Sequence, residues 1–189
     1  MPPPKKAAKK AAKKHAPHYE AHHHGKDLRR AYEHLGRVEI LRRCQPSLTG
    51  GPLQTLAALA QRELAAGHLK DAADLLRGAE HLIFAALAED AVKSPKPSPQ
   101  LAEAIEEQFH ELTARADEHW ERAEAHAGEL ALIYGNCRES AARAYDNGRF
   151  HQALEFARAA ESLAHAGKHG GHRLGTGKDR GDAHLSLTL

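Results

Sequence analysis

The chain has 189 residues with a net charge of +2, and only 5% of them are aromatic. This length suits one domain with tails or two very small domains, and an apolar set dominated by Ala and Leu favours helices over strands. Because the sequence holds no apolar stretch long enough to span a membrane and no apolar segment near residue 1, we expect neither a membrane span nor a secretory leader. With two cysteines and no Cys-x-x-Cys motif, we expect free thiols and a cytoplasmic location.

Charge is distributed unevenly along the chain. Residues 1–45 carry a charge of +8, residues 46–167 carry −8 and residues 168–189 carry +2. A basic arm joined to an acidic body predicts that the arm binds a polyanion while the body binds another partner. The alternative is that the arm folds back onto its own acidic body.

Residues 1–25 form a low-complexity arm that we expect to be disordered. Lysine pairs alternate with alanine pairs in it, a pattern that suits the neutralisation of phosphates. Because the arm lacks groups that read bases, we expect it to bind DNA or RNA without sequence specificity. The lysines concerned are Lys5, Lys6, Lys9, Lys10, Lys13 and Lys14. The arm resembles the Lys/Ala-rich tails of linker-histone-like and bacterial nucleoid proteins; a solubilising tail is the alternative.

Histidines follow the lysines, and two of them, His18 and His22, would share a helix face. Imidazole binds zinc, nickel or copper, but no cysteine or regular ligand spacing accompanies this cluster. The pair His119 and His126 lacks the spacing of a metalloprotease helix. We therefore predict no metal site and no cofactor. The cluster consists of His15, His18, His22, His23 and His24.

The body, residues 26–167, is predicted to be all-α. A first helix begins near Lys26 and ends before Pro46, since apolar residues recur in it at steps of three or four. A helical hairpin follows over residues 52–91, with its turn at Gly67.

A stiff Pro-rich linker is predicted over residues 92–99. Ser98 is expected to cap the next helix, which then carries a long apolar pattern from Leu101 onward. Gly128 is the favoured break in that pattern.

A second hairpin is predicted over residues 128–167, with its turn at Asn147-Gly148. The Gly- and His-rich tail, residues 168–189, is expected to be disordered.

An internal repeat appears when the chain is shifted by 81 positions against itself. Between residues 59–82 and 140–163, eight of 24 positions are identical. The identical pairs are Ala60/Ala141, Arg62/Arg143, Gly67/Gly148, Ala72/Ala153, Arg77/Arg158, Ala79/Ala160, Glu80/Glu161 and Leu82/Leu163.

The second copy resembles a tetratricopeptide repeat. That family places an aromatic residue before a turn glycine and then an aromatic and small residues at fixed spacing. Tyr145, Gly148, Phe150, Ala153 and Ala160 fit this pattern, and the first copy offers the weaker set Gly67, Leu69, Ala72 and Ala79. The resemblance implies antiparallel helical hairpins that bind a protein or peptide. Family repeats recur at a shorter period, however, and the early Trp and the closing proline are missing here. A small helical bundle is therefore the alternative architecture.

Two sequence spacings also allow an enzymatic interpretation. Arg29 with His34, and Arg62 with His68, satisfy the Arg-x4–6-His spacing of HEPN-family ribonucleases, to which paired helices also bear a resemblance. Sixteen histidines make such spacings common by chance. No phosphate-binding loop or nucleophile motif is present, so we predict that the chain is not an enzyme.

The preferred hypothesis is an adaptor whose helical body holds a peptide or partner helix in a groove. Candidate groove residues are Tyr145, Phe150, Phe109, Trp120 and Tyr134. One alternative is a nucleic-acid-compacting protein whose body only forms a homo-oligomer, and a HEPN-like ribonuclease is the other. Neither requires a membrane.

Overall fold

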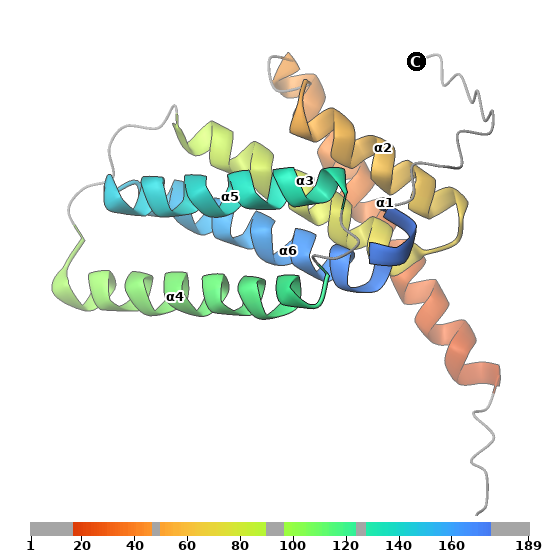
Figure 1. Ribbon diagram of the computed structural model, residues 1–189. Helices are drawn as coiled ribbons and strands as arrows, with labels where there is room; N and C mark the ends of the chain where they lie inside the picture. Colours follow the sequence, from red (N-terminus) through yellow and green to blue (C-terminus); the bar gives the residue numbers. More distant parts are fainter. Residues whose placement is uncertain (1–16, 47–49, 90–96, 124–127, 175–189) are drawn as a thin grey trace, which may run out of the picture.

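The computed structural model describes residues 17–46, 50–89, 97–123 and 128–174. These ranges hold six helices and no strand, which confirms the all-α prediction (Figure 1). The helices are α1 (Pro17–Cys44), α2 (Pro52–Ala65), α3 (Leu69–Glu89), α4 (Pro99–Glu121), α5 (Glu129–Asp146) and α6 (Phe150–Leu174). None of these described helices combines the length and apolar character needed to cross a membrane.

The helices pack as two three-helix units. In the first unit α3 packs against both α1 and α2, and in the second α6 packs against both α4 and α5. The most extensive helix–helix contact in the described chain joins the two central helices, α3 and α6. Two equivalent central helices therefore form the middle of the molecule, and each carries its own pair of outer helices.

The second unit repeats the first at the shift of 81 positions seen in the sequence. Helices α2 and α5 end at Ala65 and Asp146, and helices α3 and α6 begin at Leu69 and Phe150, each pair being 81 positions apart. The repeat also extends to the first helix of each unit, because α1 and α4 both begin at a proline and occupy the same place against their central helix.

The two hairpin turns have the same geometry. Gly67 and Gly148 have φ angles of 78° and 70°, which a side chain would strain. In both turns the residue after the glycine, His68 or Arg149, donates its backbone N–H to the carbonyl five positions earlier, at 2.8 Å. This is the hydrogen bond of a helix-terminating Schellman motif. The predicted glycine turns are therefore present, and they set the register of the repeat.

Helices α3 and α6 cross in antiparallel fashion. Gly78 faces Leu163 and Ala159, whereas Ala85, further along α3, accepts a 3.2 Å hydrogen bond from Gln152 near the start of α6. Since Gly78 and Ala159 are themselves 81 positions apart, an approximate two-fold axis that relates the two units passes between them.

Small side chains make this close packing possible. Leu56, Leu75, Leu130 and Leu163 are at most 1% exposed, and alanines fill the space between them. The residues that carried the repeat resemblance and are buried between helices are Leu69, Ala72, Ala79, Ala153 and Ala160.

Two helix ends differ from the sequence prediction. Helix α1 begins at Pro17 rather than near Lys26, and α6 continues to Leu174 through the start of the predicted tail. Apolar periodicity marks only the part of a helix that packs on a neighbour, whereas an established helix extends further by adding one hydrogen bond per residue. Proline at the first helical position also suits the observed start.

The start of α4 agrees with the prediction. Ser98 Oγ accepts a hydrogen bond from the backbone N–H of Leu101 at 3.3 Å, and Pro99 occupies the first turn. Helix α5 begins directly after Gly128, the predicted break.

Candidate partner-binding groove between α2 and α5

Three adjoining hollows follow one edge of α5, and together we name them the α2–α5 groove. The lining residues of α5 and its C-cap follow one another at steps of one or three from Glu129 to Asn147, so they form one face of the helix. At the rise of an α-helix this face is about 27 Å long. The groove is therefore long enough to lie beside several turns of another helix.

The first hollow, of 460 Å³, lies between the N-terminal ends of α2 and α5. It is lined by Gly51, Pro52, Thr55, Glu129, Leu132, Ile133 and Asn136. Three pairs of these residues are 81 positions apart: Gly51 with Leu132, Pro52 with Ile133, and Thr55 with Asn136. The hollow therefore straddles the approximate two-fold axis. Leu132 stands at its edge with 71% of its surface exposed.

The second hollow, of 180 Å³, continues the first along α5 and is almost wholly apolar. Its lining residues are Pro52, Leu82, Ile133, Asn136, Cys137, Ser140 and Phe156. Burial raises the pKa of the Cys137 thiol to about 12, so the thiol stays protonated at neutral pH. Cys137 is therefore a wall of this hollow and not a nucleophile.

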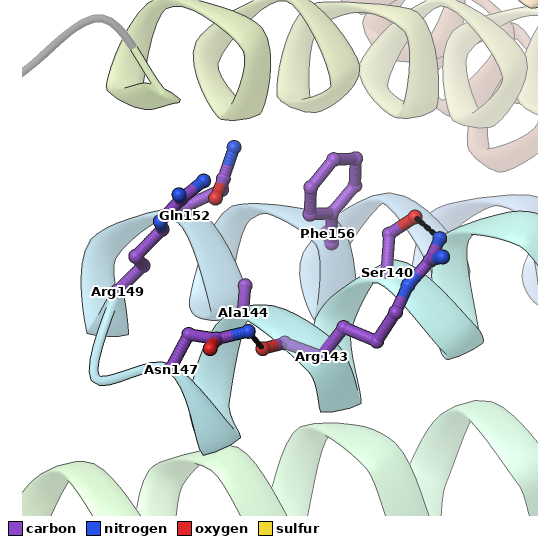
Figure 2. Close-up of a pocket in the computed structure, with 7 residues that line it drawn as sticks. All are labelled: Ser140, Arg143, Ala144, Asn147, Arg149, Gln152 and Phe156. Carbon is purple, nitrogen blue, oxygen red and sulfur yellow. Dashed lines mark hydrogen bonds between the residues drawn. The ribbon is translucent and has the colours of Figure 1, made fainter.

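The third hollow, of 290 Å³, lies where α5 ends and α6 begins (Figure 2). It is lined by Ser140, Arg143, Ala144, Asn147, Arg149, Gln152 and Phe156, so it carries two guanidinium groups and no carboxylate among these described lining residues. In Figure 2 the side chains of Gln152 and Phe156 project from α6 towards α3, and that of Arg149 comes from the turn just before α6. This end of the groove is polar, and one of its guanidinium groups, that of Arg143, lies 3.5 Å from the Glu139 carboxylate.

Hydrogen bonds fix several of these side chains. An Nη2 hydrogen of Arg143 is donated to Ser140 Oγ at 3.3 Å, and Asn147 Nδ2 donates to the Arg143 carbonyl at 2.7 Å. Gln152 is 5% exposed and bonds to the carbonyl of Ala85 on α3. The third hollow is thus preorganised by contacts from two helices of its own unit and one helix of the other.

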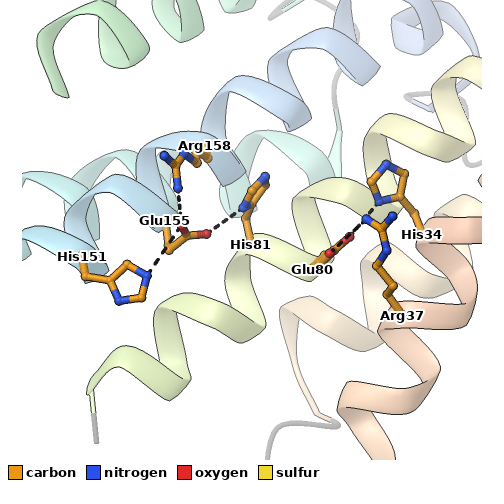
Figure 3. A network of polar contacts seen from close by, with 7 residues as sticks. All are labelled: His34, Arg37, Glu80, His81, His151, Glu155 and Arg158. Carbon is orange, nitrogen blue, oxygen red and sulfur yellow. Dashed lines mark hydrogen bonds and ion pairs between the residues drawn. The ribbon is translucent and has the colours of Figure 1, made fainter. Parts of the chain in front are cut away.

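Buried carboxylates on the central helices pair with basic side chains of neighbouring helices. Glu80 of α3 lies 2.7 Å from His34 Nδ1 and 3.4 Å from Arg37 Nη1, both on α1 (Figure 3). Burial alone would raise the pKa of Glu80, but these two partners hold it below its usual value. The second unit has an equivalent tie, since Arg115 Nε lies 3.0 Å from Glu161.

A second carboxylate joins the two units. Glu155 of α6 lies 2.7 Å from His81 Nδ1 of α3 and also pairs with Arg158 and His151 of its own helix (Figure 3). Burial would raise the pKa of Glu155, but His81 and Arg158 lower it below its usual value. The carboxylate is therefore ionised at neutral pH and links α3 to α6.

The aromatic residues predicted to line a groove lie elsewhere. Phe109 stacks on Tyr145 with ring centroids 4.4 Å apart, and Trp120 stacks on Tyr134 at 4.0 Å. Phe150 meets Tyr145 edge to face at 5.6 Å. These rings pack between α4, α5 and α6, and none of them lines the three hollows.

The residues of the ribonuclease alternative are not brought together. His34 Nδ1 bonds to Glu80, whereas His68 Nδ1 lies 2.7 Å from Glu63 Oε2 at the other end of α3. Arg29 pairs at 2.7 Å with the carboxylate four positions further along α1. Each histidine is thus held by its own buried carboxylate.

The remaining candidate residues lie largely outside the described side chains. This holds for the lysines of residues 5–14, for the histidines of residues 15–24 and for His126. His119 is described, and its ring lies 4.1 Å from that of His165. Within the described ranges no three His, Cys, Asp or Glu side chains lie close enough together to hold a metal ion.

Sequence reasoning did not single out the residues that line the groove as a set; it met Arg143 and Leu82 only as repeat identities and Asn147 only as a turn residue. A signal was present in the alignment of the two repeats, where acidic residues of the first copy are replaced in the second. Comparison with known protein families, curated proteins and solved structures gives no match for this chain.

Proposed function

We propose that this chain is a non-enzymatic interaction module that holds a helical segment of a partner protein in the α2–α5 groove. The observation that carries the proposal is the continuity of the three hollows. The first and second share Pro52, Ile133 and Asn136, and the second and third share Ser140 and Phe156.

The chemistry of the groove suits an amphipathic helix. Such helices bind through apolar residues at steps of three and four, which match the spacing of the α5 residues along the groove. Leu132 offers an exposed apolar contact at one end, and the almost wholly apolar second hollow can take an anchor side chain. The resemblance of the hairpins to tetratricopeptide repeats, a family of peptide binders, supports the same proposal.

The basic arm supplies a second contact in this proposal. Its lysines would bind DNA, RNA or another polyanion through phosphate charge alone, so the affinity should fall steeply with salt. A binding titration with DNA and RNA at several salt concentrations tests this, using the full chain and a variant that lacks residues 1–16. Unchanged affinity after the deletion would remove the arm from the proposal. In the compaction alternative the same deletion would remove the whole function.

The groove is tested with a displayed library of random peptides, selected on the full chain. Peptides that bind are then measured by fluorescence anisotropy against two variants, Leu132→Glu in the groove and Leu101→Glu on α4. Both leucines are exposed, by 71% and 53%, so both changes should leave folding intact, but only Leu132 lines the groove. We expect a loss of affinity of about tenfold or more for Leu132→Glu, since a charge would replace an apolar contact. Equal affinity for both variants would refute the groove.

A further inference from the structure

Helix α1 carries a row of large hydrophobic residues that are exposed within the described chain. Leu28, Tyr32 and Ile40 are exposed by 39%, 58% and 63%. They follow one another at steps of four and eight, so they lie on one ridge of the helix. Gly36 occupies the remaining step of this ridge, and a Cβ added there would meet nothing within 4 Å. These four residues, which we name the α1 stripe, therefore form an apolar row with a notch at its centre.

In the second unit the equivalent face of the outer helix is covered by another helix. The position 81 residues after Leu28 is Phe109, which is 7% exposed and stacks on a tyrosine ring of α5. The position 81 residues after Gly36 is Asp117, whose carboxylate accepts a hydrogen bond from Arg138 Nε of α5 at 2.7 Å. The repeat therefore uses this face to pack on a helix in the second unit and exposes it in the first.

We infer that the helix held in the α2–α5 groove is α1 of a second copy of this chain, which inserts the α1 stripe. The inference rests on the proposed function and names its partner. Leu28 and Ile40 are separated by about 18 Å along α1, so both fit within the length of the groove. At the edge of the groove Leu132, with 71% of its surface exposed, forms an apolar knob. The notch at Gly36 of the second copy lies between two large side chains and has room for such a knob.

The distribution of charge favours this contact over one between two copies of the α1 stripe. The stripe belongs to residues 1–45, which carry a charge of +8, whereas the groove is built mostly from residues 46–167, which carry −8. A stripe-to-stripe dimer brings two basic segments together, but a stripe-to-groove contact joins segments of opposite charge. Since the stripe and the groove are different surfaces, a copy bound through one still presents the other. Association therefore continues as an open chain or closes as a ring.

The test follows the size of the full chain by sedimentation velocity over a wide range of protein concentrations. Wild type should form species larger than a dimer as the concentration rises. The stripe variant carries Tyr32→Glu and Ile40→Glu, and the groove variant carries Leu132→Glu. We expect each variant alone to associate at least about tenfold more weakly than wild type, since a charge replaces an apolar contact. Leu101→Glu on α4 is the matched control and should associate as wild type does, because its position is exposed and lies outside both surfaces.

A mixture of the two variants gives the decisive result. The stripe variant keeps an intact groove and the groove variant keeps an intact stripe, so an equimolar mixture should form a dimer of one copy of each and nothing larger. This dimer also shows that both variants are folded, and circular dichroism of each variant alone is the check on folding if no dimer forms. Two folded variants that form no dimer in the mixture would overturn the inference.

The other outcomes separate this inference from the proposed function. A groove variant that associates alone as strongly as wild type would show a stripe-to-stripe dimer, and the inference fails. A wild type that stays monomeric at every concentration would also overturn it, whereas selected peptides that lose affinity in Leu132→Glu would then leave the groove standing with another partner. Peptide binding that Leu132→Glu does not affect would overturn the groove, and the inference with it.

Discussion

Replacement of Gly78 by alanine tests the crossing of the two central helices. Gly78 lies in the middle of α3, where alanine is the better helix former by about 1 kcal/mol. A Cβ atom added at this position would lie 2.6 Å from Cδ2 and 3.1 Å from Cγ of Leu163 on α6, both well inside van der Waals contact. Leu163 is fully buried, so its side chain has little room to move away.

Overpacking of a well-packed core costs about 1–3 kcal/mol, which exceeds the gain in helix propensity. We therefore expect Gly78→Ala to lower the free energy of unfolding by up to about 2 kcal/mol. Gly36→Ala on α1 is the matched control, because a Cβ added there meets nothing within 4 Å. That variant should gain up to about 1 kcal/mol from propensity alone.

Urea denaturation followed by circular dichroism measures both free energies. A double-mutant cycle of Gly78→Ala with Leu163→Ala then isolates their interaction, and we expect the second change to relieve part of the cost of the first. If Gly78→Ala were as stabilising as Gly36→Ala, the close α3–α6 crossing and the two-fold relation built on it would be wrong.

Three further changes probe single side chains. Burial raises the pKa of Asp74 to about 6, above its usual 3.8, although Arg30 lies 3.7 Å away. The folded state therefore binds the Asp74 proton more tightly than the unfolded state does, and the free energy of unfolding falls as pH rises through about 4 to 6. Asp74→Asn removes the buried charge and should raise the free energy of unfolding at pH 7 by as much as about 3 kcal/mol. The pKa of Glu80 is lowered from 4.5, so the stabilisation that its charge provides is present above that pH and is lost below it. Glu80→Gln should therefore destabilise the fold at neutral pH. In urea titrations, the difference in free energy of unfolding between this variant and wild type should shrink in acid. Ser98→Ala removes the cap of α4 and should lower the free energy of unfolding by about 1 kcal/mol, and no change would show that the cap contributes nothing.

Local signals in the sequence predicted most helix boundaries. The capping serine at Ser98, the break at Gly128 and the turns at Gly67 and Gly148 all act through the backbone of a few neighbouring residues, so a single sequence reveals them. The repeat was visible only where α2–α3 and α5–α6 keep identical residues.

The extension of the repeat to α1 and α4 could not be predicted, because their sequences have diverged. His34 and Arg115 are 81 positions apart and differ in type, yet both bind the equivalent glutamate of their central helix. What the repeat retains here is a side-chain nitrogen beside the glutamate, and that becomes apparent only once the helices are packed.

The aromatic residues predicted to line a groove pack between helices for a reason of volume. In a core made of alanine and leucine, the few large rings are needed to fill space between helices, so Phe109, Trp120 and Tyr134 are buried. The residues that line the three hollows are mostly smaller or polar positions, many of them on α5, that the apolar pattern of the sequence does not mark.

The replacement of Glu63 by Ala144 in the second copy has a consequence for the direction in which a bound segment could lie along the groove. Two identical units about a two-fold axis would present a channel that looks the same from either end, and a guest could enter head first or tail first with equal affinity. With Glu63 buried against His68 at one end and a hollow beside Ala144 at the other, that degeneracy is lifted. Divergence of the duplicated units has given a symmetric framework a polarity.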